Sequence, residues 1–122
     1  MDKSCAVFCC WPEAFRTGAG SVGGKGWNLG RLDRYGFKVP VGGVITVEVY
    51  RNFIEENNLV EATRQIEQSI SIHAVGEIAI ENELSLIREK INAGSISSPV
   101  QKELLLNLNN LGILEKSLAI RS

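Results

Sequence analysis

The residues best suited to chemistry are Gly23-Gly24-Lys25-Gly26, within a glycine-rich stretch that reads TGAGSVGGKG from 17 to 26. Glycine lets backbone N–H groups come close to an anion, and the N-terminus of a following helix adds partial positive charge. The lysine adds a full positive charge at the same place. The pattern therefore suits a phosphate group, although a flexible surface turn with a solvated lysine fits the composition about equally well.

Two better-known phosphate motifs overlap this stretch, and neither fits. The letters GAGSVG at 18–23 match G-x-G-x-x-G, but that fingerprint needs a strand directly before it and an acidic residue about 20 positions later. Mixed residues precede the stretch, and Asp33 and Glu48 are respectively too near and placed at a helix start. The P-loop pattern fails because Ala19 replaces its first glycine and Gly26 replaces its Mg²⁺-binding hydroxyl.

Charge and hydropathy exclude several function classes. The 122 residues have a net charge of -1, and their 13 lysines and arginines are scattered along the chain. Such a distribution gives no basic footprint for nucleic acid or an anionic membrane surface. No apolar run approaches the roughly 20 residues that cross a bilayer. We expect a cytoplasmic globular protein.

The three cysteines are Cys5, Cys9 and Cys10. In an extended segment Cys5 and Cys9 lie about 13 Å apart, which is too far for a disulfide. We expect small buried side chains that stay reduced. A metal site is not expected, because the single histidine, His73, is distant in sequence and no CxxC spacing exists.

Hydrophobic spacing predicts a mostly helical α+β chain with few strands. Strands are expected at 5–11, 44–45 and 117–121, with a loop at 17–26. Helices are expected at 27–35, 46–57, 59–70, 75–93 and 99–111. The helix at 75–93 is the clearest, because Ile80, Leu84, Ile87 and Ile91 fall on one stripe.

Helix ends are marked by residues with known capping preferences. Gly36, Gly94 and Gly112 are placed to end helices. Thr46 is a plausible N-cap, and Ser98-Pro99-Val100-Gln101 has the form of a capping box. We expect one unit without an internal boundary. The strand at 117–121 runs directly into the chain end, which predicts a domain that continues beyond 122.

Three motifs occur in order along the chain: GGKGWNLGRL from 23, VPVGGVITVEVY from 39, and the terminal AIRS. In order and spacing they resemble the opening of the nucleotide-binding domain of the phosphoenolpyruvate synthase and pyruvate, phosphate dikinase family, which rifamycin phosphotransferases share. The resemblance covers residues 22–122. Before residue 22 the chain matches only as a strand leading to the loop.

The resemblance implies the first subdomain of an ATP-grasp domain, mostly helical with a few strands and incomplete at its C-terminus, over residues 1–122. In the family the lysine of GGKG and the arginine of the final strand approach the phosphates of ATP. By position these are Lys25 and Arg121, with Gly23, Gly24 and Gly26 around the nucleotide. Arginine is an always-charged fork for phosphate oxygens, and lysine is a point charge. The alternative for Arg121 is a solvated arginine at a chain end.

The implied reaction moves a phosphoryl group from ATP to a histidine on a mobile domain and from there to pyruvate, with Mg²⁺ stabilising the transferring charge. The Mg²⁺ ligands, the rest of the ATP-grasp domain and the phosphohistidine domain are expected outside this chain, and His73 does not match the acceptor motif. No catalytic residue is expected here. Alone, the chain is expected to be inactive, to bind ATP weakly and to self-associate through exposed strand edges and apolar surface.

Departures from the family pattern leave alternatives open. Trp27 stands where a small residue is usual, Val41 replaces a proline, and Gly43 replaces a phenylalanine. One hypothesis is that the Trp27 ring fills the space at Gly43. A non-catalytic module that retains the fold, a rifamycin phosphotransferase-like enzyme and, more weakly, a dinucleotide-binding domain remain alternatives. The sequence leaves open the phosphoryl acceptor, the oligomeric state and any role of the cysteines.

Overall fold

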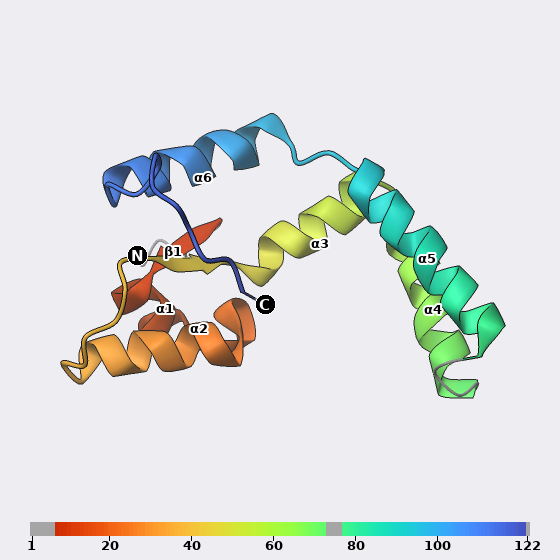
Figure 1. Ribbon diagram of the computed structural model, residues 1–122, viewed down its shortest axis with the longest axis horizontal. Helices are drawn as coiled ribbons and strands as arrows, with labels where there is room; N and C mark the ends of the chain where they lie inside the picture. Colours follow the sequence, from red (N-terminus) through yellow and green to blue (C-terminus); the bar gives the residue numbers. More distant parts are fainter. Residues whose placement is uncertain (1–6, 73–76, 122) are drawn as a thin grey trace. The chain divides into compact units, whose positions relative to one another are not determined.

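The computed structural model describes residues 7–72 and 77–121, and these form six helices and two short strands (Figure 1). This confirms the mostly helical α+β composition. The elements are β1 (Phe8–Cys10), α1 (Trp11–Thr17), α2 (Ala19–Arg34), β2 (Gly43–Ile45), α3 (Val47–Glu56), α4 (Val60–Ile72), α5 (Ile78–Ala93) and α6 (Ser98–Asn110).

The chain divides into two compact units. The first comprises residues 1–50 and 97–122, and the second comprises residues 51–96. Helix α3 begins in the first unit and ends in the second. The expectation that residues 1–122 form one partial domain is not tested by this division and stays a prediction.

Strands β1 and β2 pair antiparallel at the centre of the first unit, with Cys9 opposite Val44. The N–H of Thr46 extends the pairing by donating to the carbonyl of Val7 at 2.9 Å. Strand β1 ends earlier than expected, because Trp11 already begins α1. The sequence pattern places Pro12 at the end of a strand and does not predict this helix. Proline is equally suited to the first turn of a helix, where its missing N–H costs nothing.

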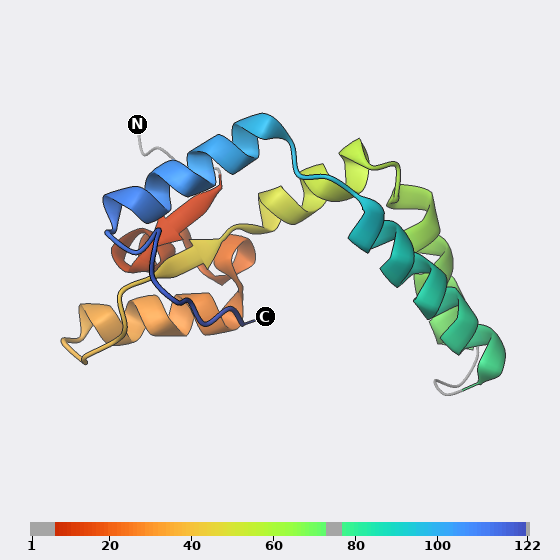
Figure 2. The ribbon, with the colours of Figure 1, turned by 45° about the horizontal axis from the view of Figure 1, so that its top comes forward.

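Helices cover both faces of this small sheet. Helices α1 and α2 lie on one side of the strands and α6 lies on the other (Figures 1 and 2). Cys9, Ala14 and Val22 form the buried centre, and Trp27 and Val44 pack against it. On α6, the expected inward stripe is half-buried at Val100, Leu104, Leu108 and Leu111.

The expected loop at 17–26 is largely helical, so that prediction was wrong. Gly18, with φ 92°, separates α1 from α2, and helix then runs from Ala19 to Arg34 with one break at Gly23. Glycine disfavours helix by about 1 kcal/mol per residue. Here tertiary packing overrides this preference, because Val22 and Gly26, on either side of the break, are buried against the sheet.

Two glycines of α2 allow elements to come closer than any side chain would permit. A Cβ on Gly26 would lie 2.6 Å from a methyl group of Val44, and one on Gly30 would lie 2.6 Å from the backbone oxygen of Trp11. Both distances are shorter than real Cβ contacts. Gly26 therefore seats α2 on β2, and Gly30 seats α2 on α1.

All three glycines placed at helix ends by sequence lie where a helix ends: Gly94 is the C-cap of α5, with φ -69°, and the other two have positive φ. Gly36 has φ 85°, its N–H donates to Asp33, and the Phe37 N–H donates to Leu32, which is a Schellman ending of α2. Gly112, with φ 71°, ends α6 through the same pair of bonds. The capping box was misplaced by one residue, since Ser97 is the N-cap of α6 and Ser98 is already helical.

Phe8, and not Trp27, occupies the space at Gly43, so the pairing hypothesis was wrong. A Cβ on Gly43 would contact the backbone oxygen of Cys9 and lie 2.5 Å from the Phe8 ring. The Trp27 ring instead stacks on Phe15, with ring centroids 6.1 Å apart. The large side chain beside Gly43 thus comes from the neighbouring strand.

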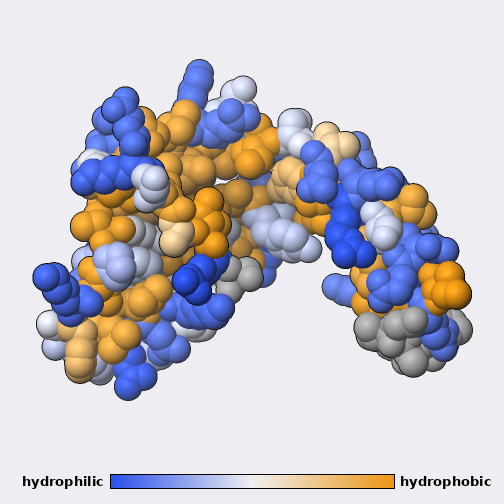
Figure 3. Space-filling model, in the orientation of Figure 1, coloured by the Kyte–Doolittle hydropathy of each residue, from blue (hydrophilic) through white to orange (hydrophobic). Residues whose placement is uncertain are grey.

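The segment 117–121 has no regular structure, and the predicted strand was wrong there. A strand needs a neighbour to satisfy its N–H and C=O groups, and the two described strands pair only with each other. The segment stays exposed, with Ile120 87% accessible. Apolar side chains gather over α6 and the segment that follows it in the chain (Figure 3).

The second unit is built on the antiparallel pair α4 and α5. Ile80 and Ile87 of α5 are buried and Leu84 is half-buried, which confirms the predicted stripe at these positions, whereas its fourth residue, Ile91, is 38% exposed. Residues 75 and 76 of the predicted helix lie outside the described residues. Asn57 closes the base of the unit, because its amide donates to the carbonyls of Phe53 and Ser95 and accepts from the Ser95 N–H at 3.0 Å.

Candidate functional site

Lys25 lies two residues after the only break in α2. Gly23 has φ 76° and ψ 166°, which are not helical values, and the helix restarts behind it. Glycine adopts positive φ at little energetic cost, because it has no Cβ atom. The break gives the segment from Gly24 to Arg34 an N-terminus of its own, with Lys25 exposed in its first turn. Helix N-termini carry unpaired N–H groups and partial positive charge.

The three predicted glycines have different surroundings. Gly24 is exposed, and a Cβ there would meet nothing within 4 Å, so a ligand has room to approach this backbone. Gly23 provides the turn and is likewise open on its Cβ side. Gly26 is buried and faces Val44. Its glycine is explained by packing, and its predicted contact with the nucleotide remains a prediction.

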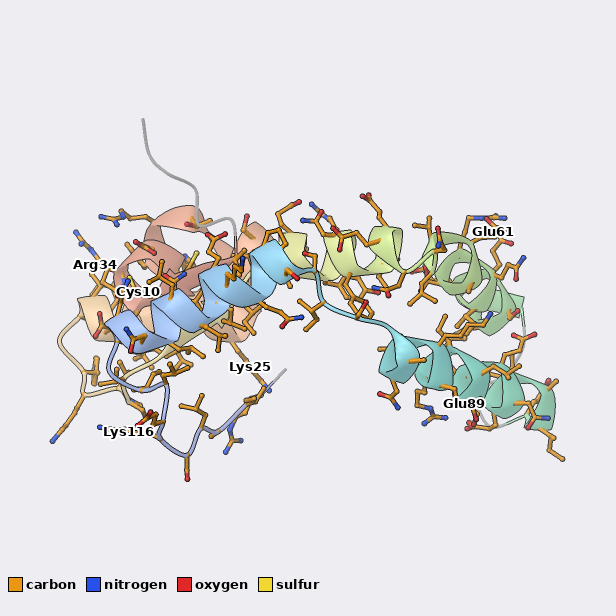
Figure 4. The ribbon with its side chains drawn as sticks, turned by 90° about the horizontal axis from the view of Figure 1, so that it is seen from above. Cys10, Lys25, Arg34, Glu61, Glu89 and Lys116 are labelled. Carbon is orange, nitrogen blue, oxygen red and sulfur yellow. The ribbon has the colours of Figure 1, made fainter. Side chains whose placement is uncertain are left out.

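The last described residues run past the N-terminal part of α2 (Figures 1 and 2). Figure 4 shows the Lys25 side chain extending toward the same region. Lys25 and the segment that carries Arg121 thus lie on the same side of the first unit. Arg121 is exposed, so its guanidinium is accessible to a ligand.

Cysteines and candidate metal ligands lie elsewhere. Cys9 is fully buried and Cys10 half-buried, and both are free thiols, as expected. Burial raises the pKa of the Cys10 thiol, with Glu13 adding to the rise through its charge. Cys5 and His73 lie outside the described residues. Within 7–72 and 77–121, no three His, Cys, Asp or Glu residues are grouped to hold a metal ion.

Comparison with known protein families shows which family the chain belongs to. The model of the pyruvate phosphate dikinase AMP/ATP-binding domain matches residues 19–122, which include α2, the break at Gly23 and Arg121. The chain belongs to this family. The resemblance noted from three short motifs is therefore confirmed, and it extends through α4 and α5, where no motif was noted.

Several relatives of this AMP/ATP-binding domain are named as probable phosphoenolpyruvate synthases. That of Methanocaldococcus jannaschii is 30% identical over 105 residues, which are 83% of this chain and 9% of the relative. That of Pyrococcus horikoshii is 43% identical over 56 residues, 45% of this chain and 7% of the relative. That of Methanothermobacter thermautotrophicus is 24% identical over 110 residues, 90% of this chain and 16% of the relative.

The chain thus spans less than a fifth of the length of these relatives. No solved structure matches it. Among the helices of the described residues, none combines the length and the apolar character that crossing a bilayer requires.

Proposed function

We propose that this chain forms part of the ATP-binding site of a phosphoenolpyruvate synthase-like phosphotransferase of the cytoplasm. The observation that carries the proposal is the family match across residues 19–122, together with the helix break that puts Lys25 at a fresh helix N-terminus. An anion at that position would meet backbone N–H groups, a helix dipole and an ammonium group together.

Lys25 and Arg121 would hold the phosphates in different ways. The exposed Lys25 supplies a point charge that can follow the phosphate chain. Arg121, in the segment that runs along the same side, supplies a planar fork that can bind two phosphate oxygens. Gly24 would let the backbone approach the nucleotide, since no atom fills the space on its Cβ side.

The architecture and chemistry of the whole phosphotransferase follow from the same proposal. We place the chain in the first subdomain of an ATP-grasp fold, in which bound ATP would pass its γ-phosphoryl group to a histidine of a mobile domain and then to pyruvate. The described residues offer no cluster of acids for Mg²⁺. As the family resemblance implies, we place the metal ligands and the accepting histidine in other parts of the enzyme.

Nucleotide titration of single-site variants tests the assignment. Lys25→Ala and Arg121→Ala should each weaken ATP binding by about 10-fold or more, because a hydrogen bond to a charged group contributes about 1.5–3 kcal/mol. Binding can be followed by calorimetry, or by the fluorescence of Trp27, which lies two residues from Lys25.

Matched controls separate local from general charge effects. Lys38→Ala and Arg16→Ala remove exposed cations elsewhere in the first unit and should leave the affinity for ATP unchanged. Equal losses in all four variants would mean that net charge alone attracts the nucleotide. Unchanged affinity in both Lys25→Ala and Arg121→Ala would refute the assigned roles.

A further inference from the structure

The surface of α1 and α2 carries a continuous row of stacked arginines and aromatic rings. The Arg34 guanidinium lies 5.4 Å from the Phe15 ring centroid, and Phe15 stacks on Trp27. The Arg31 guanidinium lies 5.5 Å from Trp27 and 5.7 Å from Tyr35. We call these five residues the arginine ladder. The order in space is Arg34, Phe15, Trp27, Arg31 and Tyr35.

The ladder holds two positive charges ready for an acidic partner. The side chains of Arg31 and Arg34 are exposed and make no hydrogen bond or ion pair with a described residue. Figure 4 shows Arg34 extending outward from the end of α2. A guanidinium stacked on a ring keeps its N–H edges free. Because the ring already holds the side chain in place, binding a partner costs little further conformational entropy. Each such edge can bind both oxygens of one carboxylate through two parallel hydrogen bonds.

Apolar surface adjoins these charges. Tyr35 is 63% exposed and Phe37, two residues further on, is 62% exposed. Aromatic side chains and arginine are the residues most enriched at protein interfaces. The ladder and Phe37 therefore suit a partner surface on which carboxylates alternate with apolar side chains.

The second unit of the chain carries such a surface. Residues 51–96 contain eight glutamates against four basic residues, a net charge of -4, which leaves +3 on the other residues since the whole chain has -1. On α5, the side opposite the buried Ile80 and Ile87 presents exposed apolar residues and glutamates at helical spacing. These are Ile78, Glu81, Leu86 and Glu89.

The glutamates of this face are available. The carboxylates of Glu81 and Glu89 make no ion pair or hydrogen bond with a described residue. Figure 4 shows Glu89 on the side of α5 that faces away from α4. The face thus matches the ladder both in the sign of its charge and in its mixture of apolar and charged groups.

We propose that the arginine ladder of one copy binds the outer face of α5 of a second copy. Two different surfaces meet in this contact, so association is head-to-tail and closes into a ring or continues as an open chain. The contact uses neither Lys25 nor Arg121, the two side chains proposed to bind phosphate. It differs from the expected self-association through strand edges, since it depends on charge.

Sedimentation velocity at two salt concentrations tests the proposal. The chain should sediment as oligomers at about 20 mM salt and as a monomer at about 0.5 M. At high salt the attraction between opposite charges acts over a much shorter distance, because the ions screen it. The double variant R31E/R34E should be monomeric at both, and so should E81R/E89R. Mixing the two variants should restore association, because their reversed faces complement each other.

Two further results decide against the proposal. A wild-type chain that is monomeric at low salt and about 1 mM protein overturns it, as does a mixture of variants that stays monomeric although circular dichroism shows both folded. Association that persists in R31E/R34E but is lost in L118S/I120S assigns the contact to the apolar surface near the chain end, and also overturns it.

Discussion

At the scale of single residues, glycines in this chain have three different structural roles. Gly23 and Gly36 adopt positive φ, Gly24 leaves open space beside an exposed lysine, and Gly26 and Gly30 permit close packing. Only positions next to a predicted helix end, such as Gly36, could be assigned from sequence. Close approach of two elements depends on tertiary contacts, which a local pattern does not contain.

Gly30→Ala tests the close packing of α1 against α2. The added Cβ would lie 2.6 Å from the backbone oxygen of Trp11 and 2.9 Å from the backbone N of Phe15, and backbone cannot swing aside. We expect a loss of about 1–3 kcal/mol in the free energy of unfolding, measured by urea denaturation.

Gly20→Ala is the matched control. Gly20 also lies in α2, but a Cβ there would meet nothing within 4 Å. Alanine should therefore stabilise the helix by about 0.5–1 kcal/mol. If both variants lose stability equally, the loss at Gly30 does not come from the packing of α1 against α2.

At the scale of elements, the sequence predicts helices well and strands poorly. The stripe on α5 and the glycine endings of α2 and α6 were found, because both depend on residues close in sequence. The segment 117–121, Ser-Leu-Ala-Ile-Arg, reads as a strand, yet it has no regular structure. Strand formation depends on a pairing partner, and a short apolar run alone does not provide one.

The base of the second unit depends on a single side chain. Asn57 joins the end of α3 to the residue after Gly94 through its bonds with Phe53 and Ser95. Asn57→Ala should lower the free energy of unfolding by about 1–3 kcal/mol, the sum of the contributions of one part-buried and two exposed hydrogen bonds. Hydrogen exchange at the Ser95 amide should accelerate in the same variant, since its acceptor is removed.

Asn52→Ala provides the comparison for this prediction. Asn52 is exposed on α3, and its replacement should leave exchange at Ser95 unchanged. If Asn57→Ala also leaves the Ser95 exchange rate unchanged, the clamp does not hold the two segments together in solution.

At the scale of the whole molecule, the family was predictable because its three motifs are widely spaced and occur in order. The site was predictable only in part. Sequence correctly indicated a helix N-terminus near Lys25, but it placed a loop where α2 has a single break. The arginine ladder was missed, although Trp27, Arg31 and Tyr35 follow each other at intervals of four on a predicted helix.

The central claim is that Lys25 and the segment ending at Arg121 meet one triphosphate. Amide chemical shifts, recorded while the chain is titrated with ATP and separately with adenosine, test it most directly. We predict that ATP shifts the amides of Gly24, Lys25, Ile120 and Arg121 together along one binding curve, and that adenosine leaves them in place. If ATP moves only one of the two segments, or adenosine moves both equally, then the two residues do not share the phosphates.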